Sequence, residues 1–459
     1  MPAATPAPNT SHGAGLARKL GLFDATMLVM GGIIGSGIFM NPYVVARAVH
    51  TPALIMGAWF VGGLVAIAGA FIYAELAARL PEVGGQYAYL REAYSPMVAF
   101  LYGWALLLVT QTGGMAAVAV TFSRYFLDLT GAPPGGGAIP DWLVAILALG
   151  ILTLINCLGV KMGSSVQSGL MVMKIAAIAA LICVGFFLVH QSQITWTPVL
   201  DQPLSGGLIS SFGAALIPVL FAYGGWQTAN FIAAEMKEPR KNLPRGLLIG
   251  VSGVIALYLG VSFVCVRALG VDGLATTTTP ASSVMRLVMG SRGATLIALG
   301  IAVSTLGFLS QSILTAPRVY FAMAEDGSFF RTLAWIHPRT RVPVAAIVLQ
   351  SVWTMVVAVS GRYEQILNYV VSMDFVFFGL SATTLFVFRA REARGEGPPA
   401  ESIGYRVPGH PFTTIFFVAI CWLVVGNTIY RYPSHSLIGF AILLAGIPVY
   451  LLWKKAQRN

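Results

Sequence analysis

Two glycine-rich stretches interrupt segments that are otherwise apolar. The first, GGIIGSGIF, covers 31–39, and the second, YGGW, covers 223–226. Glycine adopts backbone angles that other residues avoid, so each stretch predicts an unwound turn within a helix. Inside a lipid bilayer an unpaired backbone N–H or C=O group is costly, so such a turn must face protein, ligand or water. The two turns are therefore the first candidates for a binding site.

The helix ends at these turns have the polarity that a zwitterion needs. The half-helix that starts at 36–38 offers free N–H groups and a positive dipole end, which attract a carboxylate. The half-helices that end near 33 and near 221–222 offer carbonyl oxygens, which attract an ammonium group. The residues expected to bind an α-amino acid are Ile33, Gly35, Ser36, Gly37, Ile38, Phe221, Ala222, Tyr223, Gly224 and Gly225. Close helix packing through small residues is the alternative interpretation, since Gly31 and Gly35 also fit that pattern.

Lys174 places a cation about twelve residues into an apolar segment. At 1.5 Å per residue that is roughly 18 Å, near the middle of a hydrocarbon core about 30 Å thick. A charge there costs at least about 2.5–3.5 kcal/mol, so it needs partners. We expect these to be the carbonyl groups of 31–34 and Ser304. The alternative is a lysine that donates to carbonyls for stability alone.

Asp374 is the only acidic residue deep in an apolar segment. It could contact the substrate side chain or carry a proton, or it could serve an interhelical hydrogen bond or a buried cation. No metal site or cofactor is expected, because the histidines lack metal-ligand spacing and lie in predicted loops or tails. These histidines are His12, His50, His190, His337, His410 and His435. The sequence has no phosphate-binding loop, so ATP is not the expected energy source.

The composition identifies the elements that must position these residues. Of 459 residues, 57% are hydrophobic and only 10% are charged, and the mean hydropathy is +0.78. A soluble domain carries about 25% charged residues, so this is an integral membrane protein without a separate soluble domain. Its four cysteines fall in apolar stretches and are expected to be core residues. Twelve helical spans are predicted, at about 22–48, 53–78, 96–127, 139–158, 163–189, 208–234, 244–268, 293–317, 342–361, 364–388, 411–430 and 435–453.

The basic residues predict the orientation. With both termini inside, the inner loops and tails hold 20 Lys and Arg residues and the outer side holds seven. Positive residues favour the cytoplasmic side, so both termini are expected there, and the net charge of +11 reflects a bilayer and not a nucleic acid. The two breaks lie in the first span of each of two successive groups of five spans. This arrangement predicts an inverted repeat with a binding site at the midplane. The expected divisions are a disordered tail (1–20), repeat one (21–190), repeat two (207–390), a cytoplasmic linker (391–410), and two final spans with a tail (411–459).

Five stretches resemble the amino acid–polyamine–organocation transporters, and within them the L-type amino acid transporters. They are GGIIGSGIF, YAELAARLPEVGGQYAYLREAYSP, INCLGVKMGSSVQ, FAYGGWQTANFIAAEMKEPRKNLPRG and ILTAPRVYFAMAEDG. They run from the first predicted span to the eighth. The later spans resemble the family in the general character of their residues more than in the exact sequence. The resemblance implies an all-α LeuT-type fold with twelve transmembrane helices: two inverted repeats of five, broken helices one and six, and two peripheral helices. It also implies amino acid transport by alternating access.

The resemblance also implies roles for single residues. Those at 33, 36–38 and 221–223 would bind the substrate backbone, and Phe221 would be the aromatic gate toward the outside. Tyr258 matches a tyrosine that lines the family pocket. Lys174 would replace a bound sodium ion and join the first and eighth spans, where Ser304 lies. One departure concerns the loop at 130–141, which lacks the cysteine that binds an accessory glycoprotein in eukaryotic L-type chains, so no disulfide-linked partner is expected.

The expected function is secondary active transport of L-amino acids, as a sodium-independent exchanger or a proton-linked permease, with neutral substrates favoured. Transport of cationic amino acids or polyamines by antiport is the alternative, and a sensor that does not transport is a further one. A channel would repeat a filter around a symmetry axis, and a membrane enzyme would cluster His, Asp, Glu or Cys on span faces; neither pattern is present. The missing cysteine and the short tails favour a bacterial inner membrane.

Overall fold

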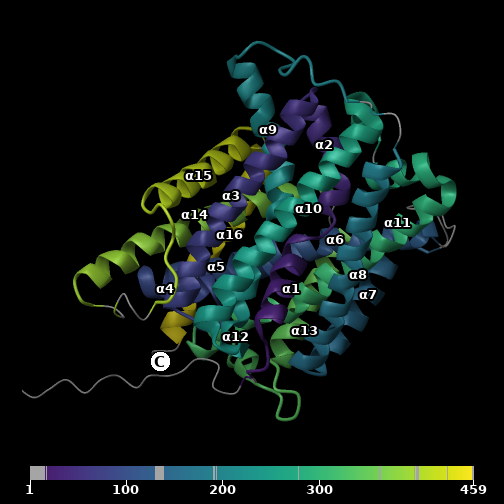
Figure 1. The fold of residues 1–459 in the computed structure, drawn as a ribbon. Helices are drawn as coiled ribbons and strands as arrows, with labels where there is room; N and C mark the ends of the chain where they lie inside the picture. The colour runs from purple at the N-terminus through teal and green to yellow at the C-terminus, as the bar shows by residue number, and fades with distance from the viewer. Residues whose placement is uncertain are drawn as a thin grey trace, which may run out of the picture.

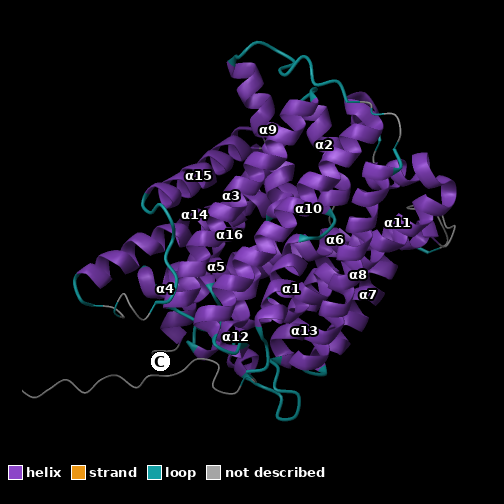
Figure 2. Cartoon of the chain, in the orientation of Figure 1, coloured by secondary structure: helices purple, strands orange, loops and turns teal. Residues whose placement is uncertain are grey.

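The computed structural model describes residues 16, 18–129, 139–189, 192, 194–277, 279–360, 363–396, 399, 403–431 and 433–456. The described chain is helical, with no strand, and carries one isolated parallel bridge between Leu20 and Met236 (Figure 2). Nine of its helices are long and apolar enough to cross a membrane, or ten if one bent pair counts as a single span. The chain is therefore a multi-pass membrane protein. Residues 1–15 and 17 of the predicted tail (1–20) and residues 130–138 of the loop at 130–141 lie outside the described residues.

The long helices follow the predicted spans. Two helices that match predicted spans four and nine, Asp141–Cys157 and Val344–Val359, are apolar but shorter than the nine or ten. The helices are α1 Leu22–Ile33, α2 Gly37–Ala48, α3 Pro52–Arg79, α5 Pro96–Ala105, α6 Gln111–Leu129, α7 Asp141–Cys157, α8 Val160–Phe187, α9 Gly206–Tyr223, α10 Pro239–Thr276, α11 Pro280–Thr315, α13 Val344–Ser360, α14 Tyr363–Ala393, α15 Phe412–Arg431 and α16 Pro433–Ala456.

Shorter elements fall between these helices. They are α4 Gln86–Ala93, α12 Pro317–Glu325, the π-helix η1 Leu106–Thr110 and the 3₁₀-helices η2 Trp226–Glu235 and η3 Arg331–Ala334. In Figure 1, α1 runs through the middle of the bundle beside α10, and α15 lies along one edge. Helix α1 contacts α8, α10 and α11, and nine of its twelve residues are buried, so it lies inside the packing. The central position of α1 puts its broken end deep inside the protein.

Both glycine-rich stretches end a helix. α1 stops at Ile33, α2 begins at Gly37, and the two axes differ by 40°. α9 stops at Tyr223, and η2 continues after two glycines as a 3₁₀-helix. Gly225 has a φ of 101°, a conformation in which other residues are strained. The sequence prediction of a break at each of these positions agrees with the helix bounds.

The glycines also let the two breaks touch. A Cβ at Gly37 would lie 2.9 Å from Ala222 on α9, and a Cβ at Gly32 would lie 2.6 Å from the carbonyl oxygen of Gly225. Real Cβ atoms do not come so close, so a side chain at these positions would push the two segments apart. Turn formation and close packing, which the sequence left as alternatives, therefore occur together here.

A buried carboxylate anchors the segment between α14 and α15. Glu75, at the end of α3, is fully buried and accepts hydrogen bonds from the guanidinium groups of Arg79 and Arg389. It also accepts one from the backbone N–H of Val407, at 2.7 Å. The described part of the predicted linker is thus held against the bundle by main-chain and charged contacts.

Candidate functional site

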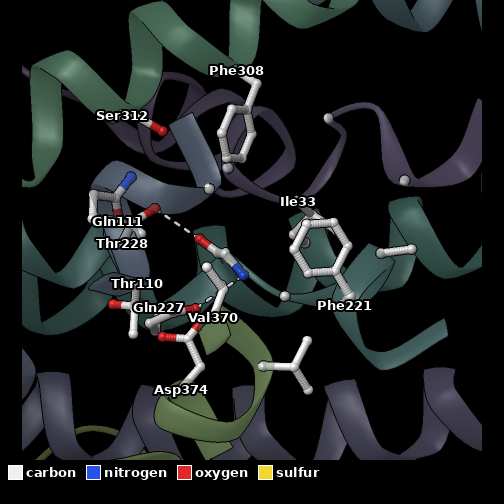
Figure 3. A pocket seen from close by; sticks show the side chains of 18 of the residues that line it. Ile33, Thr110, Gln111, Phe221, Gln227, Thr228, Phe308, Ser312, Val370 and Asp374 are labelled. Atoms are coloured by element: carbon white, nitrogen blue, oxygen red, sulfur yellow. Dashed lines mark hydrogen bonds between the residues drawn. The ribbon is translucent and has the colours of Figure 1, made fainter. Parts of the chain in front are cut away.

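The two breaks meet at one cavity near the centre of the bundle (Figure 3). About 70 Å³ of it is open to the centres of water-sized molecules. A single water needs roughly 10–15 Å³ of such space, so the open part of the cavity corresponds to about five to seven waters. The side chains and backbone that line it come from the two breaks and from η1, α6, α11 and α14. A cavity of this kind suits a small organic molecule.

The start of α2 offers unpaired donors to this cavity. Ser36 and Gly37 line it. Neither of their backbone N–H groups donates a hydrogen bond to an acceptor in the part of the chain that the structure describes. Ser36 is 1% exposed, and its hydroxyl also lacks a partner among the described residues. These donors sit at the positive end of a helix of twelve residues, so the position favours an anion.

The carbonyl groups at the end of α1 are already in use. The Ile33 oxygen accepts hydrogen bonds from the Gly35 N–H at 2.9 Å and from the Tyr258 hydroxyl at 3.1 Å. The Ile34 oxygen accepts one from the Lys174 ammonium group. A carbonyl oxygen has two lone pairs, so Ile33 has little capacity left for a ligand.

The end of α9 has more capacity. The Phe221 oxygen accepts one hydrogen bond, from the Gly224 N–H at 3.1 Å, and helix α9 ends two residues later. The last carbonyls of a helix lack intrahelical partners. Phe221, Ala222, Gly224 and Gly225 all line the cavity. A cation in the cavity would therefore find its acceptors mainly on α9.

The structure brings most of the expected substrate residues to this cavity. Those that line it are Ile33, Gly35, Ser36, Gly37, Phe221, Ala222, Gly224, Gly225 and Asp374. Ile38, Tyr223 and Tyr258 do not. Ile38 is fully buried, and Tyr223 lines a second, smaller cavity against α3. Tyr258 packs against Tyr223, with ring centroids 5.0 Å apart, and reaches the site only through its hydrogen bond to Ile33.

Several polar residues of the cavity were not expected from the sequence. They are Thr110, Gln111, Gln227, Thr228, Gln311 and Ser312. The signal that could have found them is a pair of adjacent polar residues inside an apolar segment, as at 110–111, 227–228 and 311–312, although such pairs also occur away from the cavity, as at 350–351. The residues of the first pair also owe their place to the π-helix η1, which ends at Thr110. Such an extra-wide turn often marks a functional position, but sequence periodicity does not reveal it.

Asp374 faces the cavity without a basic partner. The side chain of Thr110 lies beside its carboxyl group in Figure 3. Among the described residues that line the cavity there is no Lys, Arg or His. An acidic group in this setting can meet a donor or a cation on the ligand.

Lys174 lies outside the cavity, behind the first break. Its side chain is fully buried, and its ammonium group donates to the Ile34 carbonyl. A Cβ at Gly307 on α11 would lie 3.3 Å from Lys174 Cε, so the lysine fills the space beside α11. Ser304, the other expected partner, is buried, and its hydroxyl has no partner among the described residues.

The chain is similar to known transporters over nearly its whole length. The family model described as "Amino acid permease" matches residues 20–453. The "Serine/threonine exchanger SteT" of Bacillus subtilis (strain 168) is 32% identical over 97% of this chain and 99% of its own length. The human "Large neutral amino acids transporter small subunit 2" is 29% identical over 96% of this chain and 81% of its own. The human "b(0,+)-type amino acid transporter 1" is 30% identical over 83% and 78%.

Proposed function

Because the chain belongs to the amino acid permease family, whose members are transporters and not enzymes, we propose that it is a sodium-independent exchanger of small neutral L-amino acids. It would move them by alternating access across the plasma membrane of a bacterium, which is the inner membrane. The printed name of the Bacillus subtilis relative, a serine/threonine exchanger, supports exchange and a small substrate.

The observation that carries the proposal is the meeting of two opposite helix ends at one cavity. The substrate carboxylate would take the free N–H groups of Ser36 and Gly37, and its ammonium group would take the carbonyls at the end of α9. Hydrogen bonds to charged groups contribute about 1.5–3 kcal/mol each, so two such contacts dominate the binding of a small ligand. Phe221, at the same helix end, would be the gate.

The size of the cavity supports a short side chain. Its free volume corresponds to about five to seven waters, a space that suits a small amino acid such as alanine or serine. Gly114 on α6 lines the cavity, and a Cβ built there meets no atom within 4 Å. This open space would receive the substrate side chain, next to Gln111 and Thr110.

Sodium independence rests on Lys174. Its ammonium group donates to a carbonyl at the end of α1 while its alkyl chain packs against Gly307 of α11. A fixed cation would thereby join the first break to α11, as a bound sodium ion would. Ser304 would accept from the ammonium group at another stage of the cycle.

The helix order supports twelve spans in two inverted repeats. We propose that α7 and α13 also cross the membrane, so that both termini are cytoplasmic and 21–190 and 207–390 form the repeats. A short helix follows the second span of each repeat: α4 in the first, and in the second the start of α11 before its break at Gly290, where φ is 64°. The loop at 130–141 has no cysteine, so a disulfide-linked accessory subunit is not part of the proposal.

Asp374 favours a second candidate, an exchanger of short cationic amino acids. An acid in a cavity without a basic residue would pair with a cationic side chain. Replacement of Asp374 by Asn separates the two candidates: loss of competition by a short diamino acid with retained competition by serine would support the cationic one. Thr110→Val is the matched control, since it removes the neighbouring hydroxyl group and keeps the charge.

Counterflow in proteoliposomes tests the proposal. Vesicles loaded with unlabelled serine should accumulate labelled serine against its gradient, in sodium and in choline buffer alike. Vesicles without internal amino acid should accumulate little. Binding of amino acids without counterflow would indicate a sensor, and strong stimulation by sodium would overturn sodium independence.

A further inference from the structure

Several arginines at the end of the bundle that holds α4 and α12 are paired. Each of the following ion pairs joins a guanidinium group to a carboxylate: Arg79–Glu75 at 2.7 Å, Arg91–Asp326 at 2.6 Å, Arg318–Glu235 at 2.7 Å, Arg389–Glu75 at 2.6 Å and Arg391–Glu92 at 3.5 Å. The protein itself neutralises these five cations. Exposed cations at this end without a carboxylate partner are, in contrast, available to an anion from outside the chain.

A group of such cations gathers where α16 ends. The rings of Phe330 and Trp453 are in edge contact, with centroids 4.8 Å apart. The Trp453 indole N–H donates to the Gly327 carbonyl at 3.0 Å, which ties α16 to the loop after α12. Arg331 and Lys454 follow these two aromatic residues directly, so the contact brings them to one corner. We call Phe330, Arg331, Trp453, Lys454 and Lys455 the α16 corner.

The cations of the α16 corner have no acidic partner in the described chain. Arg331, Lys454 and Lys455 are exposed, and none of them forms an ion pair with a described residue. Lys454 lies 5.9 Å above the ring of Tyr450, a contact that leaves its charge uncompensated. Three exposed cations in one place repel one another, and a bound anion would relieve that repulsion.

Apolar surface adjoins these cations on the same helix. Leu451 is 56% exposed and Leu452 is 68% exposed, and Phe330 on the facing loop is 53% exposed. Along α16 the order is thus exposed leucines, a tryptophan and then two lysines. This order matches the depth profile of one membrane leaflet, from acyl chains through the interface to the headgroups.

We propose that the α16 corner binds an anionic phospholipid of the cytoplasmic leaflet. Its headgroup phosphate would lie among Arg331, Lys454 and Lys455, and an acyl chain would lie along Leu451 and Leu452. A free phosphate would satisfy the cations alone, whereas a lipid satisfies the cations and the exposed leucines together. The inference rests on the orientation proposed above, and not on the identity of the transported amino acid.

Binding of phosphatidylglycerol to the purified full-length protein in a neutral detergent tests this, with native mass spectrometry as the readout. The wild type should bind phosphatidylglycerol more tightly than phosphatidylcholine. Each cation near a membrane surface is worth about fivefold in affinity, so the variant with Arg331→Gln, Lys454→Gln and Lys455→Gln should bind it at least about tenfold more weakly. The double variant with the two lysine changes alone should lose an intermediate amount.

A matched control removes three exposed cations elsewhere at the same end of the bundle: Lys237→Gln, Lys241→Gln and Arg394→Gln. It has the same net charge as the test variant and should bind phosphatidylglycerol like the wild type. An equal loss in the control, equal affinity for phosphatidylcholine, or displacement of the lipid by millimolar inorganic phosphate would each overturn the proposal. Serine counterflow gives a separate readout, so failure of the lipid site and failure of the transport function are distinguishable.

Discussion

Gly37 combines two requirements in one residue, since it begins α2 and touches Ala222. A side chain at Gly37 would occupy the space of α9, where a Cβ already comes within 2.9 Å. Gly37→Leu should therefore abolish serine binding and cost about 1–3 kcal/mol of stability through overpacking. The measurement is serine affinity of the purified variant by calorimetry, with size-exclusion chromatography to establish folding.

Gly426→Leu is the control for this change, because a Cβ at Gly426 on α15 meets nothing within 4 Å. It should bind serine like the wild type. A folded Gly37→Leu protein with unchanged serine affinity would remove the start of α2 from the site.

Lys174 also acts at the scale of one residue. Its removal leaves a cavity and an unpaired Ile34 carbonyl beside the first break, so Lys174→Ala should lower the exchange rate at least about tenfold. Labelled serine exchange in sodium and in choline buffer is the measurement. Equal rates in the two buffers are expected for the wild type. Wild-type exchange in the variant would show that Lys174 does not join α1 to α11.

At the scale of elements, we propose that the contact between α9 and its neighbours controls access to the cavity. Phe221 lines the cavity and also packs against a small cluster that includes Ala117 on α6 and Val370 on α14. If it closes the cavity, Phe221→Ala should slow exchange about tenfold or more and change serine affinity little, because an occlusion step is lost. Parallel measurement of exchange rate and affinity decides between the two roles; a collapse of affinity with a normal rate would make Phe221 a wall of the pocket.

The sequence predicted the helices well because lipid imposes a strong rule. A span must be long, apolar and internally hydrogen-bonded, so α3 and α8 are evident from hydropathy alone. α4 and α12 were not predicted, because Gln86–Ala93 and Pro317–Glu325 are too short and too polar for that rule. The helix breaks were predicted from glycine alone.

The part of the cavity that would receive the substrate side chain was harder to predict than the helix breaks. Thr110 and Gln111 reach it from the end of a π-helix, and Phe308 reaches it from α11, where it packs against Gly35. These positions depend on how separate helices are rotated against one another. Asp374 could be predicted as a site residue from the sequence because an acidic residue inside a membrane span is rare.

For the whole molecule, the two broken segments form one unit that other helices enclose. η2 and the segment before α1 are tied together, since the Glu235 carbonyl accepts hydrogen bonds from the N–H groups of Lys19 and Leu20. The Glu235 carboxylate, itself fully buried, holds Arg318 of α12 at 2.7 Å. These main-chain and charged contacts hold η2, α12 and the segment before α1 together.

The central claim is that the start of α2 binds the substrate carboxylate and the end of α9 binds its ammonium group. Competition against labelled serine exchange by two analogues tests it most directly. L-serine methyl ester lacks the carboxylate charge, and N-acetyl-L-serine lacks the ammonium charge. Each lost charged contact is worth about 1.5–3 kcal/mol, so each analogue should compete at least about tenfold more weakly than L-serine. Competition by either analogue at the concentration at which L-serine competes would contradict the claim.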